Sequence, residues 1–516
     1  MYLAASRGMD GWVMRVYMLL SGFLLAIAFA PLDIAPVVFL LIPFFMLAVK
    51  HAPTPKEAFR RGWFMGFGLA LAGLNWIGAA FTLQSEVPQW LAPIAIIALA
   101  AFLGLYKGLA FYIAKRFERR GIMRVVVFTF AFVAVEWMQG HLFTGFPWLI
   151  LGSIWANWTV MLQGAALVGL YGLSIFTVFV AGSLLLFFEK STSRITHATP
   201  LIAMSFLLLW VGFGFWRLNT TEITVQPGVN LRLVQANIHQ QVKWHPRMVD
   251  HNFNRYLDMS RGNSETGKAS GVDVIIWPET AVTEPLDRRD SLRRYRMSRI
   301  LEPGAYILSG SPRVAYGEGG VQYYNSLFAI DSEGNIPAVY DKSHLVPFGE
   351  YVPLESIMSA IGVTQLVGGS GFSAGGGPRT MRLPGLPAFS PLICYEAIFP
   401  DRALNRADRP EWLLNVTNDG WFGLSAGPHQ HLALTRMRAV EEGLPLVRVA
   451  GTGISGVIDP LGRDLATIGL QRQGIINSRL PKPVTDMPTL DLSKNALSLL
   501  MLLLLGGFAL FVRESD

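Results

Sequence analysis

The sequence of 516 residues contains one cysteine and few charged residues, since Asp, Glu, Lys and Arg together make up only 15% of it. A single thiol cannot form a disulfide within the chain, which excludes a small fold held together by disulfide bonds. The low charged fraction accompanies a hydrophobic fraction of 52%, and this combination lies outside the range of soluble globular proteins. We therefore expect much of the chain to lie in lipid.

Eight apolar runs account for this composition, seven before a large polar segment and one after it. Each is near the roughly 20 residues that a bilayer-spanning helix needs. A cleaved signal peptide is the alternative for the first run, because Arg7 and Arg15 accompany an apolar stretch with small residues. Six further runs follow it, which favours an uncleaved first span. The expected spans cover roughly residues 14–30, 34–49, 63–83, 91–114, 125–138, 161–188, 201–216 and 496–512.

Positively charged residues are confined to alternate loops between these spans. Lys and Arg follow the second, fourth and sixth spans, whereas the loops near residues 31–33, 84–90 and 140–159 contain neither. Because basic loops stay on the cytoplasmic side, we expect the N-terminus inside and the polar segment on the outer face. These loops explain most of the net charge of +7, and no basic stripe with interleaved aromatic residues indicates a nucleic-acid partner.

The polar segment has the length and composition of one domain. The expected organisation is therefore a transmembrane domain at residues 1–218, an extracytoplasmic domain at 219–489, and a last transmembrane helix with a cytoplasmic tail at 490–516. Strand-like apolar runs and two helical segments predict a two-sheet α/β sandwich flanked by helices. The expected strands are 231–238, 272–279, 305–314, 324–331, 389–396, 412–419, 446–453 and 454–462, and the helices are 248–261 and 429–443.

Cys394 ends the apolar run "FSPLICYE", and the Pro400–Asp401 pair that follows suits the opening of a helix. A nucleophile at such a turn is exposed at the sheet edge, close to backbone N–H groups that can hold an oxyanion. A thiol also needs a base or a cation nearby, and two other strand ends carry Glu279, in "VIIWPE", and Lys342, in "YDKSHLVPFGEYVP". Taken singly, each residue has an inert alternative, as a buried thiol or a solvated charge.

The motifs "WPET", "YDKSHLVPFGEYVP" and "ICYE" occur in the order and at roughly the spacing of the Glu–Lys–Cys carbon–nitrogen hydrolase, or nitrilase-like, superfamily. With "FTGFPWLILG", "VQANIHQQVKW", "NVTNDGWFG" and the flanking spans, the whole chain resembles the apolipoprotein N-acyltransferase family. The resemblance implies a nitrilase-like αββα sandwich for the polar domain. It also implies Cys394 as nucleophile, Glu279 as general base and then acid, and Lys342 as electrostatic stabiliser.

Further residues match family positions beside this triad. Glu350 and Glu396 are expected to orient or tune it, and Tyr395, Trp244 and Asn325 are expected near it. The aromatic residues have a packing role as their alternative.

The resemblance implies a reaction without a cofactor or metal. An acyl chain passes from a membrane phospholipid, with phosphatidylethanolamine as the expected donor, through a cysteine thioester to the α-amine of an N-terminal diacylglyceryl-cysteine of an apolipoprotein. The implied location is the bacterial inner membrane, with several spans and the catalytic domain on the periplasmic face. A membrane-tethered amidase or nitrilase-type hydrolase with the same triad is the alternative. A transporter is disfavoured because the spans show no evident internal repeat.

Three further sequence patterns, outside the triad motifs, give weaker indications. Residues 352–378 combine an apolar segment with a glycine-rich stretch, which suits either a mobile arm dipping into the interface or a packed helix with a surface loop. His429 and His431 lack a metal ligand set and are expected to cap a helix or lie on the surface. Lys107 and Glu136 lie in or near the fourth and fifth spans, where ionisable groups are usually functional.

Overall fold

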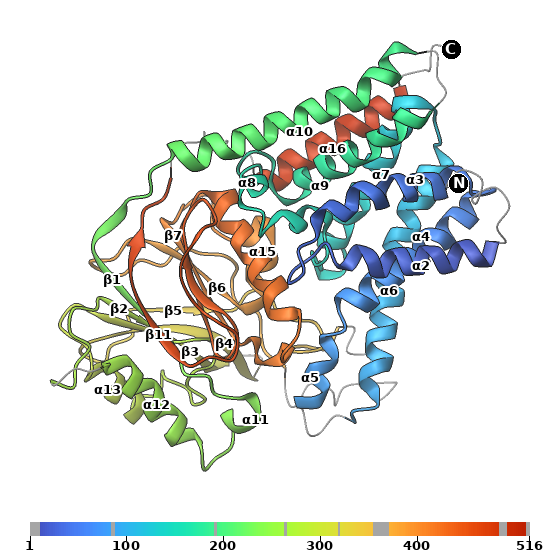
Figure 1. The fold of residues 1–516 in the computed structure, drawn as a ribbon. Coiled ribbons are helices and arrows are strands. Elements are labelled where there is room, and N and C mark those ends of the chain that lie inside the picture. The colour runs from blue at the N-terminus through green and yellow to red at the C-terminus, as the bar shows by residue number, and fades with distance from the viewer. Residues whose placement is uncertain are drawn as a thin grey trace.

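A bundle of apolar helices and a domain of two β-sheets lie side by side in this chain (Figure 1). The computed structural model describes residues 11–83, 88–189, 193–262, 266–317, 320–353, 371–484 and 493–511. Most of the expected arm at residues 352–378 lies outside these described residues.

Helices occupy all eight of the apolar segments. They are α2 (Gly11–Ala26), α3 (Val38–Lys50), α4 (Pro55–Gly73), α5 (Ile77–Leu83), α6 (Leu91–Arg116), α7 (Gly121–His141), α8 (Thr159–Leu162), α9 (Ala165–Ser183), α10 (Arg194–Thr220) and α16 (Lys494–Phe511). In sequence α16 follows the whole polar domain, yet it packs against α7 and α9 of the N-terminal bundle (Figure 1).

Four helical segments are long and apolar enough to cross a membrane, namely residues 91–116, 121–144, 165–188 and 194–220. Three more, at residues 11–26, 35–50 and 494–509, are apolar but shorter. The expected span at residues 63–83 is divided between α4 and α5, and α4 begins earlier, at Pro55, where the Thr54 side chain accepts the Glu57 N–H. The total of eight spans therefore stays a prediction.

Lys107 and Glu136, the two ionisable residues noted within the apolar segments, form an ion pair at 2.8 Å between α6 and α7. Both side chains are buried. Glu136 also accepts hydrogen bonds from the Leu151 N–H at 3.1 Å and from the Ser174 hydroxyl at 2.8 Å. Pairing offsets the cost of two charges in an apolar bundle, so this contact ties α6, α7 and α9 together.

The polar domain contains the expected two-sheet sandwich. The six-stranded sheet has the order β11–β1–β2–β3–β4–β5, and the five-stranded sheet has the order β10–β9–β8–β7–β6. The strands are β1 (Val225–Gln235), β2 (Val274–Ile276), β3 (Tyr306–Gly317), β4 (Gly320–Asp331), β5 (Ala338–Asp341), β6 (Phe389–Ile393), β7 (Trp412–Thr417), β8 (Leu446–Ala450), β9 (Ser455–Ile458), β10 (Asp464–Ile468) and β11 (Gly474–Pro481).

Three apolar clusters hold the layers together. The cluster between the sheets includes Leu233, Ile276 and Val416. A second cluster packs α12 (Val249–Arg261) and α13 (Leu292–Ser298) on the outer face of the six-stranded sheet. On the far side of the five-stranded sheet, α15 (Gly427–Glu442) contributes residues both to that sheet's outer cluster and to the cluster of the helical bundle. Helix α15 therefore lies between the sandwich and the apolar helices (Figure 1).

Candidate active site

Strand direction brings the expected residues to one edge of the sandwich. In the six-stranded sheet β2 is parallel to β3, and β4 pairs antiparallel with both β3 and β5, so β2 and β5 run the same way. Glu279 follows β2 and Lys342 follows β5, which places both at the same edge. Asn418 follows β7 of the other sheet, and its backbone N–H donates to Glu279 Oε2 at 2.7 Å. This contact joins the edges of the two sheets.

Cys394 begins a short turn, η6 (Cys394–Ile398), directly after the fully buried strand β6. Its φ is 53°, in the left-handed region, which costs a non-glycine residue about 1–2 kcal/mol. Neighbouring side chains hold this conformation: His431 Nε2 lies 3.1 Å and Asn415 Nδ2 lies 3.4 Å from the Cys394 carbonyl oxygen. Such strain persists where the surroundings determine the backbone, as at many catalytic residues.

A closed set of contacts links the expected base and the expected cation. Asn325, on β4, donates its side-chain amide to Glu279 Oε1 at 2.7 Å and to Glu350 Oε1 at 3.1 Å. Lys342 Nζ lies 2.8 Å from Glu350 Oε1 and 3.7 Å from Glu279 Oε1. Glu350 Oε2 accepts the Val346 N–H at 2.8 Å, which fixes the carboxylate. The structure thus brings Asn325 and Glu350 to Glu279 and Lys342.

The charges in this cluster act on one another. Burial raises the pKa of the Cys394 thiol to about 12, the charge of Glu279 adds to the rise, and the charge of Lys342 opposes it. Burial alone would lower the pKa of the Lys342 ammonium. The carboxylates of Glu350 and Glu279 have the larger combined effect and raise this pKa above its usual value. At neutral pH the thiol is therefore protonated and Lys342 is charged, so the thiol needs a base before it can act as a nucleophile.

Glu396 ties the cysteine turn to the lysine loop. Its Oε2 accepts the Ile393 N–H at 2.7 Å, just before Cys394. Its Oε1 accepts the backbone N–H and the hydroxyl of Ser343, each at 2.7 Å, just after Lys342. Glu396 is buried, and its position between the two segments fixes them relative to one another. No contact between Glu396 and Glu279 is found among the described residues, and the expected orienting role of Glu396 stays a prediction.

Tyr395 and Trp244 have different surroundings. Tyr395 is buried, and its hydroxyl donates to the Gly145 carbonyl oxygen at 3.1 Å, in the helical bundle. Trp244 follows α11 (Gln240–Lys243) and is 48% exposed, so it lies outside the buried cluster.

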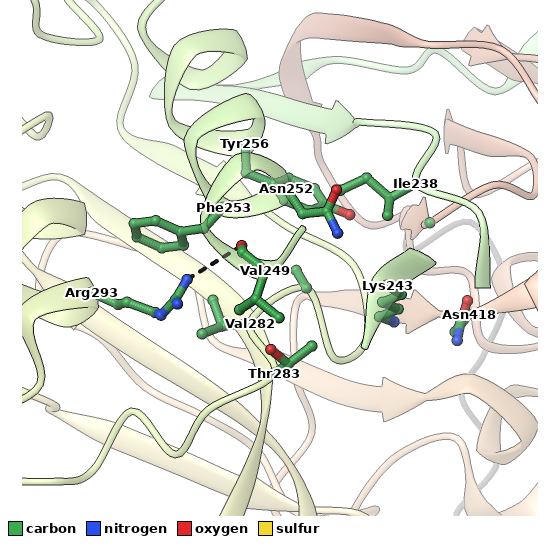
Figure 2. Close-up of a pocket in the computed structure, with 12 residues that line it drawn as sticks. Ile238, Lys243, Val249, Asn252, Phe253, Tyr256, Val282, Thr283, Arg293 and Asn418 are labelled. Atoms are coloured by element: carbon green, nitrogen blue, oxygen red, sulfur yellow. Dashed lines mark hydrogen bonds between the residues drawn. The ribbon is translucent and has the colours of Figure 1, made fainter. Parts of the chain in front are cut away.

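Lys243 is a buried cation that the sequence reasoning missed. Its Nζ donates to the Thr280 hydroxyl at 2.6 Å and to the Glu279 carbonyl oxygen at 3.2 Å. Burial lowers its pKa to about 8, although the charge of Glu279 favours the ammonium. Figure 2 shows Lys243 and Asn418 at one end of a pocket whose other end holds Arg293. The motif "VQANIHQQVKW" carries Lys243 and was the available signal.

His431 corrects a sequence-based expectation, because it is fully buried on α15 and has no surface role. Its Nδ1 lies 2.9 Å from Asp419 Oδ1, and Asp419 in turn forms an ion pair with Arg448 at 2.7 Å. Burial alone would raise the pKa of Asp419, but Arg448 and His431 together hold it well below its usual range. Among the described residues, no group of three or more His, Cys, Asp or Glu side chains could hold a metal ion.

Two family descriptions match this chain. Residues 21–183 match the family described as apolipoprotein N-acyltransferase N-terminal domain, and residues 230–486 match the family described as carbon-nitrogen hydrolase. The first match falls on the helical bundle, and the second falls on the sandwich that contains the Cys394 cluster.

Curated relatives match over most of the chain. An apolipoprotein N-acyltransferase of Rhodopseudomonas palustris is 38% identical over 488 residues, which cover 92% of this chain and 90% of that protein. An apolipoprotein N-acyltransferase of Bradyrhizobium diazoefficiens is 37% identical over 489 residues, with the same shares covered.

Solved structures resemble part of the chain. A carbon-nitrogen hydrolase superfamily protein of Xanthomonas campestris is 22% identical, with a TM-score of 0.35, and the match covers 50% of this chain and 91% of that one. A nitrilase superfamily protein of Saccharomyces cerevisiae is 16% identical, with a TM-score of 0.37, covering 57% of this chain and 100% of that one.

Proposed function

The chain belongs to the apolipoprotein N-acyltransferase family, and from that premise we propose that its acyl transfer passes through a thioester on Cys394. It is an enzyme of lipoprotein acylation within the carbon–nitrogen hydrolase superfamily, with phospholipid and lipoprotein as its substrates. The observation that supports the thioester most strongly is the strained turn of Cys394 at the edge where Glu279 and Lys342 meet.

In the first half-reaction Glu279 takes the Sγ proton, because the raised pKa of Cys394 keeps the resting thiol neutral. The thiolate then attacks the ester carbonyl carbon of the phospholipid. As the new C–S bond forms and the ester C–O bond breaks, Glu279 returns the proton to the departing glycerol oxygen. The products are a thioester on Cys394 and a lysophospholipid.

Lys342 stabilises the negative charge that develops on the carbonyl oxygen during this attack. Glu350 accepts one hydrogen bond from its ammonium and thereby sets the direction of the remaining donors. Asn325 donates to both Glu350 and Glu279 and so bridges two carboxylates that would otherwise repel each other.

In the second half-reaction the α-amine of the diacylglyceryl-cysteine attacks the thioester. The C–N bond forms and the C–S bond breaks, while Glu279 takes a proton from the amine and returns one to the Cys394 sulfur. A thioester suits this step because an amine displaces a thiolate more readily than an alkoxide. The same carboxylate therefore serves as base and acid in both halves.

Phosphatidylethanolamine as donor, and a periplasmic catalytic domain on a multi-pass inner-membrane protein, belong to the same proposal. The loop charges support the orientation, since Lys and Arg lie in alternate loops. The hydrolase alternative is not favoured, because relatives matched over about nine-tenths of the chain are N-acyltransferases.

Purified full-length protein incubated with phospholipid carrying a labelled acyl chain tests the thioester. We expect a protein-bound label that hydroxylamine releases, faster with phosphatidylethanolamine than with phosphatidylglycerol, and none with Cys394→Ala. Cys394→Ala should still insert in the membrane, because the change removes a single sulfur atom. A label that persists in Cys394→Ala would contradict the assignment of the nucleophile.

A further inference from the structure

Two tryptophans of the helical bundle meet one glutamine of the catalytic domain. Trp76, between α4 and α5, donates its indole N–H to Gln430 Oε1 at 3.1 Å, and Trp148, after α7, donates to the same oxygen at 2.7 Å. All three side chains are buried, and the indole rings lie 5.0 Å apart. A single acceptor with two buried donors fixes the first turn of α15 against the bundle.

The residue after Gln430 reaches the nucleophile. His431 Nε2 lies 3.1 Å from the carbonyl oxygen of Cys394, and because a carbonyl oxygen only accepts hydrogen bonds, Nε2 carries the proton of this contact. Asp419 and Arg448 lie 2.9 Å and 3.2 Å from His431 Nδ1 and hold the ring in place. The Trp148 ring lies 5.9 Å from the imidazole and covers it from the bundle side.

The bundle segment from Gly145 to Trp148 also contacts the residue that follows the nucleophile in the chain. The Gly145 carbonyl oxygen accepts from the hydroxyl of Tyr395, the residue after Cys394. Gly145 has a φ of 83°, and a Cβ there would lie 2.2 Å from the Gly140 carbonyl oxygen, so the segment needs glycine. Gln139 on α7 donates to the Trp148 carbonyl oxygen at 2.9 Å and anchors the segment to that helix.

We propose that the helical bundle positions the thiol of Cys394, through Gln430 and His431 on one side and through Tyr395 on the other. The inference rests on the proposed role of Cys394 as nucleophile. His431 and Trp148 are then positioning residues: they touch no substrate, and they hold the backbone from which the thiol projects. The positive φ of Cys394 makes this support necessary, because a free turn would relax to a commoner conformation.

The contacts also make the geometry of the catalytic site depend on the helical bundle. A catalytic domain that drifted from the bundle would lose the Gln430 and Tyr395 contacts together, and its thiol would leave the position facing Glu279 and Lys342. Acyl transfer is thereby restricted to molecules in which the two parts are docked. A misplacement of about 1 Å at a reacting atom can lower a rate about a hundredfold.

A double-mutant cycle in the full-length protein tests this proposal, with the rate of labelled acyl-adduct formation on Cys394 measured at several phospholipid concentrations. Trp148→Phe keeps an aromatic side chain but replaces the indole with a smaller phenyl ring that has no N–H, and Gln430→Leu deletes the shared acceptor. We expect each to lower kcat for adduct formation about tenfold with KM within about twofold. In the Gln430→Leu background, Trp148→Phe should lower kcat no further, because its N–H acts only through Gln430.

His431 supplies the second arm of the test. His431→Leu should lower kcat about a hundredfold, and His431→Gln, whose amide N–H can reach the same carbonyl oxygen, should regain most of it at an unchanged thermal midpoint. His429→Leu, two residues earlier on the same helix, is the matched control and should leave kcat unchanged. His429 is partly exposed on α15, whereas His431 is fully buried.

Three results would overturn the proposal. Losses in kcat that multiply in the Trp148→Phe and Gln430→Leu double variant would show that the two side chains act separately. A rise in KM at constant kcat would make Trp148 a lipid-binding residue. The absence of any adduct in the unsubstituted protein would overturn the thioester itself, and with it this inference, whereas the first two results leave the thioester intact.

Discussion

At the scale of single residues, the state of the Cys394 thiol depends on two opposite charges. Burial and the carboxylate of Glu279 raise its pKa, while the ammonium of Lys342 lowers it. Removing Glu279 should therefore lower the thiol pKa and favour the thiolate, although it also removes the base. Removing Lys342 should raise the thiol pKa and disfavour the thiolate. Thiol reactivity and acyl transfer are expected to respond in opposite directions to the loss of Glu279.

Alkylation by iodoacetamide checks this prediction, because Cys394 is the only cysteine in the chain. At pH 8 the alkylation rate should increase for Glu279→Gln and decrease for Lys342→Met, by about tenfold for each unit of change in pKa. In the unsubstituted protein the rate should keep rising from pH 8 to 10, since the thiol pKa is about 12. A rate that levels off near pH 9, or the reverse order of the two variants, would contradict the assigned charges.

The sequence identified the residues of this cluster that lie in recognisable motifs, namely Glu279, Lys342, Glu350, Cys394 and the asparagine that joins two of them. It missed Lys243 and misplaced His431. Lys243 and His431 act on backbone carbonyl oxygens of Glu279 and Cys394 across 36 and 37 residues of chain. A contact to a backbone atom constrains no residue type at the distant position, so the sequence does not show which residue Lys243 or His431 contacts, although Lys243 itself lies in a recognisable motif.

At the scale of elements, the turn after β2 sits directly on β3. A Cβ at Gly310 would lie 2.4 Å from the Thr280 nitrogen and 2.6 Å from Glu279 Cα. Glycine at this strand position lets the two backbones approach, so the shape of β3 sets the position of the general base.

Gly310→Ala should therefore displace Glu279 and lower the rate of acyl-adduct formation at least about tenfold, with a loss of about 1–3 kcal/mol in stability from overpacking. Gly376→Ala is the matched control, because a Cβ at that exposed position meets no atom within 4 Å. The measurements are adduct formation and the thermal midpoint of each variant. An unchanged adduct rate in Gly310→Ala would mean that the position of Glu279 does not depend on this close approach.

The strands that the sequence predicted and those that it missed differ in burial. Strands β2, β6, β7, β8 and β9 are buried along their whole length, and each coincides with a predicted apolar run. β5 is short, and β10 is mostly exposed, so neither gives an apolar signal. β11 has only three buried residues along its eight, and its pairing with β1 joins residues about 250 positions apart. Such pairing depends on the whole domain and leaves little trace in local composition.

At the scale of the whole molecule, the chain passes from α10 into β1 within a few residues, so the sandwich is held against the end of a helix long enough to cross a membrane. Four residues, Thr221 to Thr224, lie between α10 and β1. The domain limits at residues 218 and 489 stay predictions, as does the side of the membrane on which the sandwich lies.

Reporter fusions test the predicted sides. A reporter enzyme that works only outside the cytoplasm should be active when fused after Asn219 and inactive when fused after Arg120, because the loop that contains Arg120 is basic. Each fusion is compared with a reporter that works only inside. Extracytoplasmic activity at Arg120 would reverse the orientation and place the Cys394 site in the cytoplasm.

The central claim is that an amine, and not water, resolves the thioester on Cys394, and the rate of loss of the labelled acyl group tests it most directly. The isolated acyl-enzyme is mixed with buffer, with a diacylated lipopeptide that has a free N-terminal cysteine amine, with its N-acetylated form, or with the same peptide lacking the diacylglyceryl group. We expect rapid loss only with the free-amine lipopeptide, because acetylation removes the nucleophilic lone pair and the unlipidated peptide lacks the anchor that positions it. The label should appear as an amide on the lipopeptide. Equal and rapid loss under all four conditions, with free fatty acid as the product, would contradict the account.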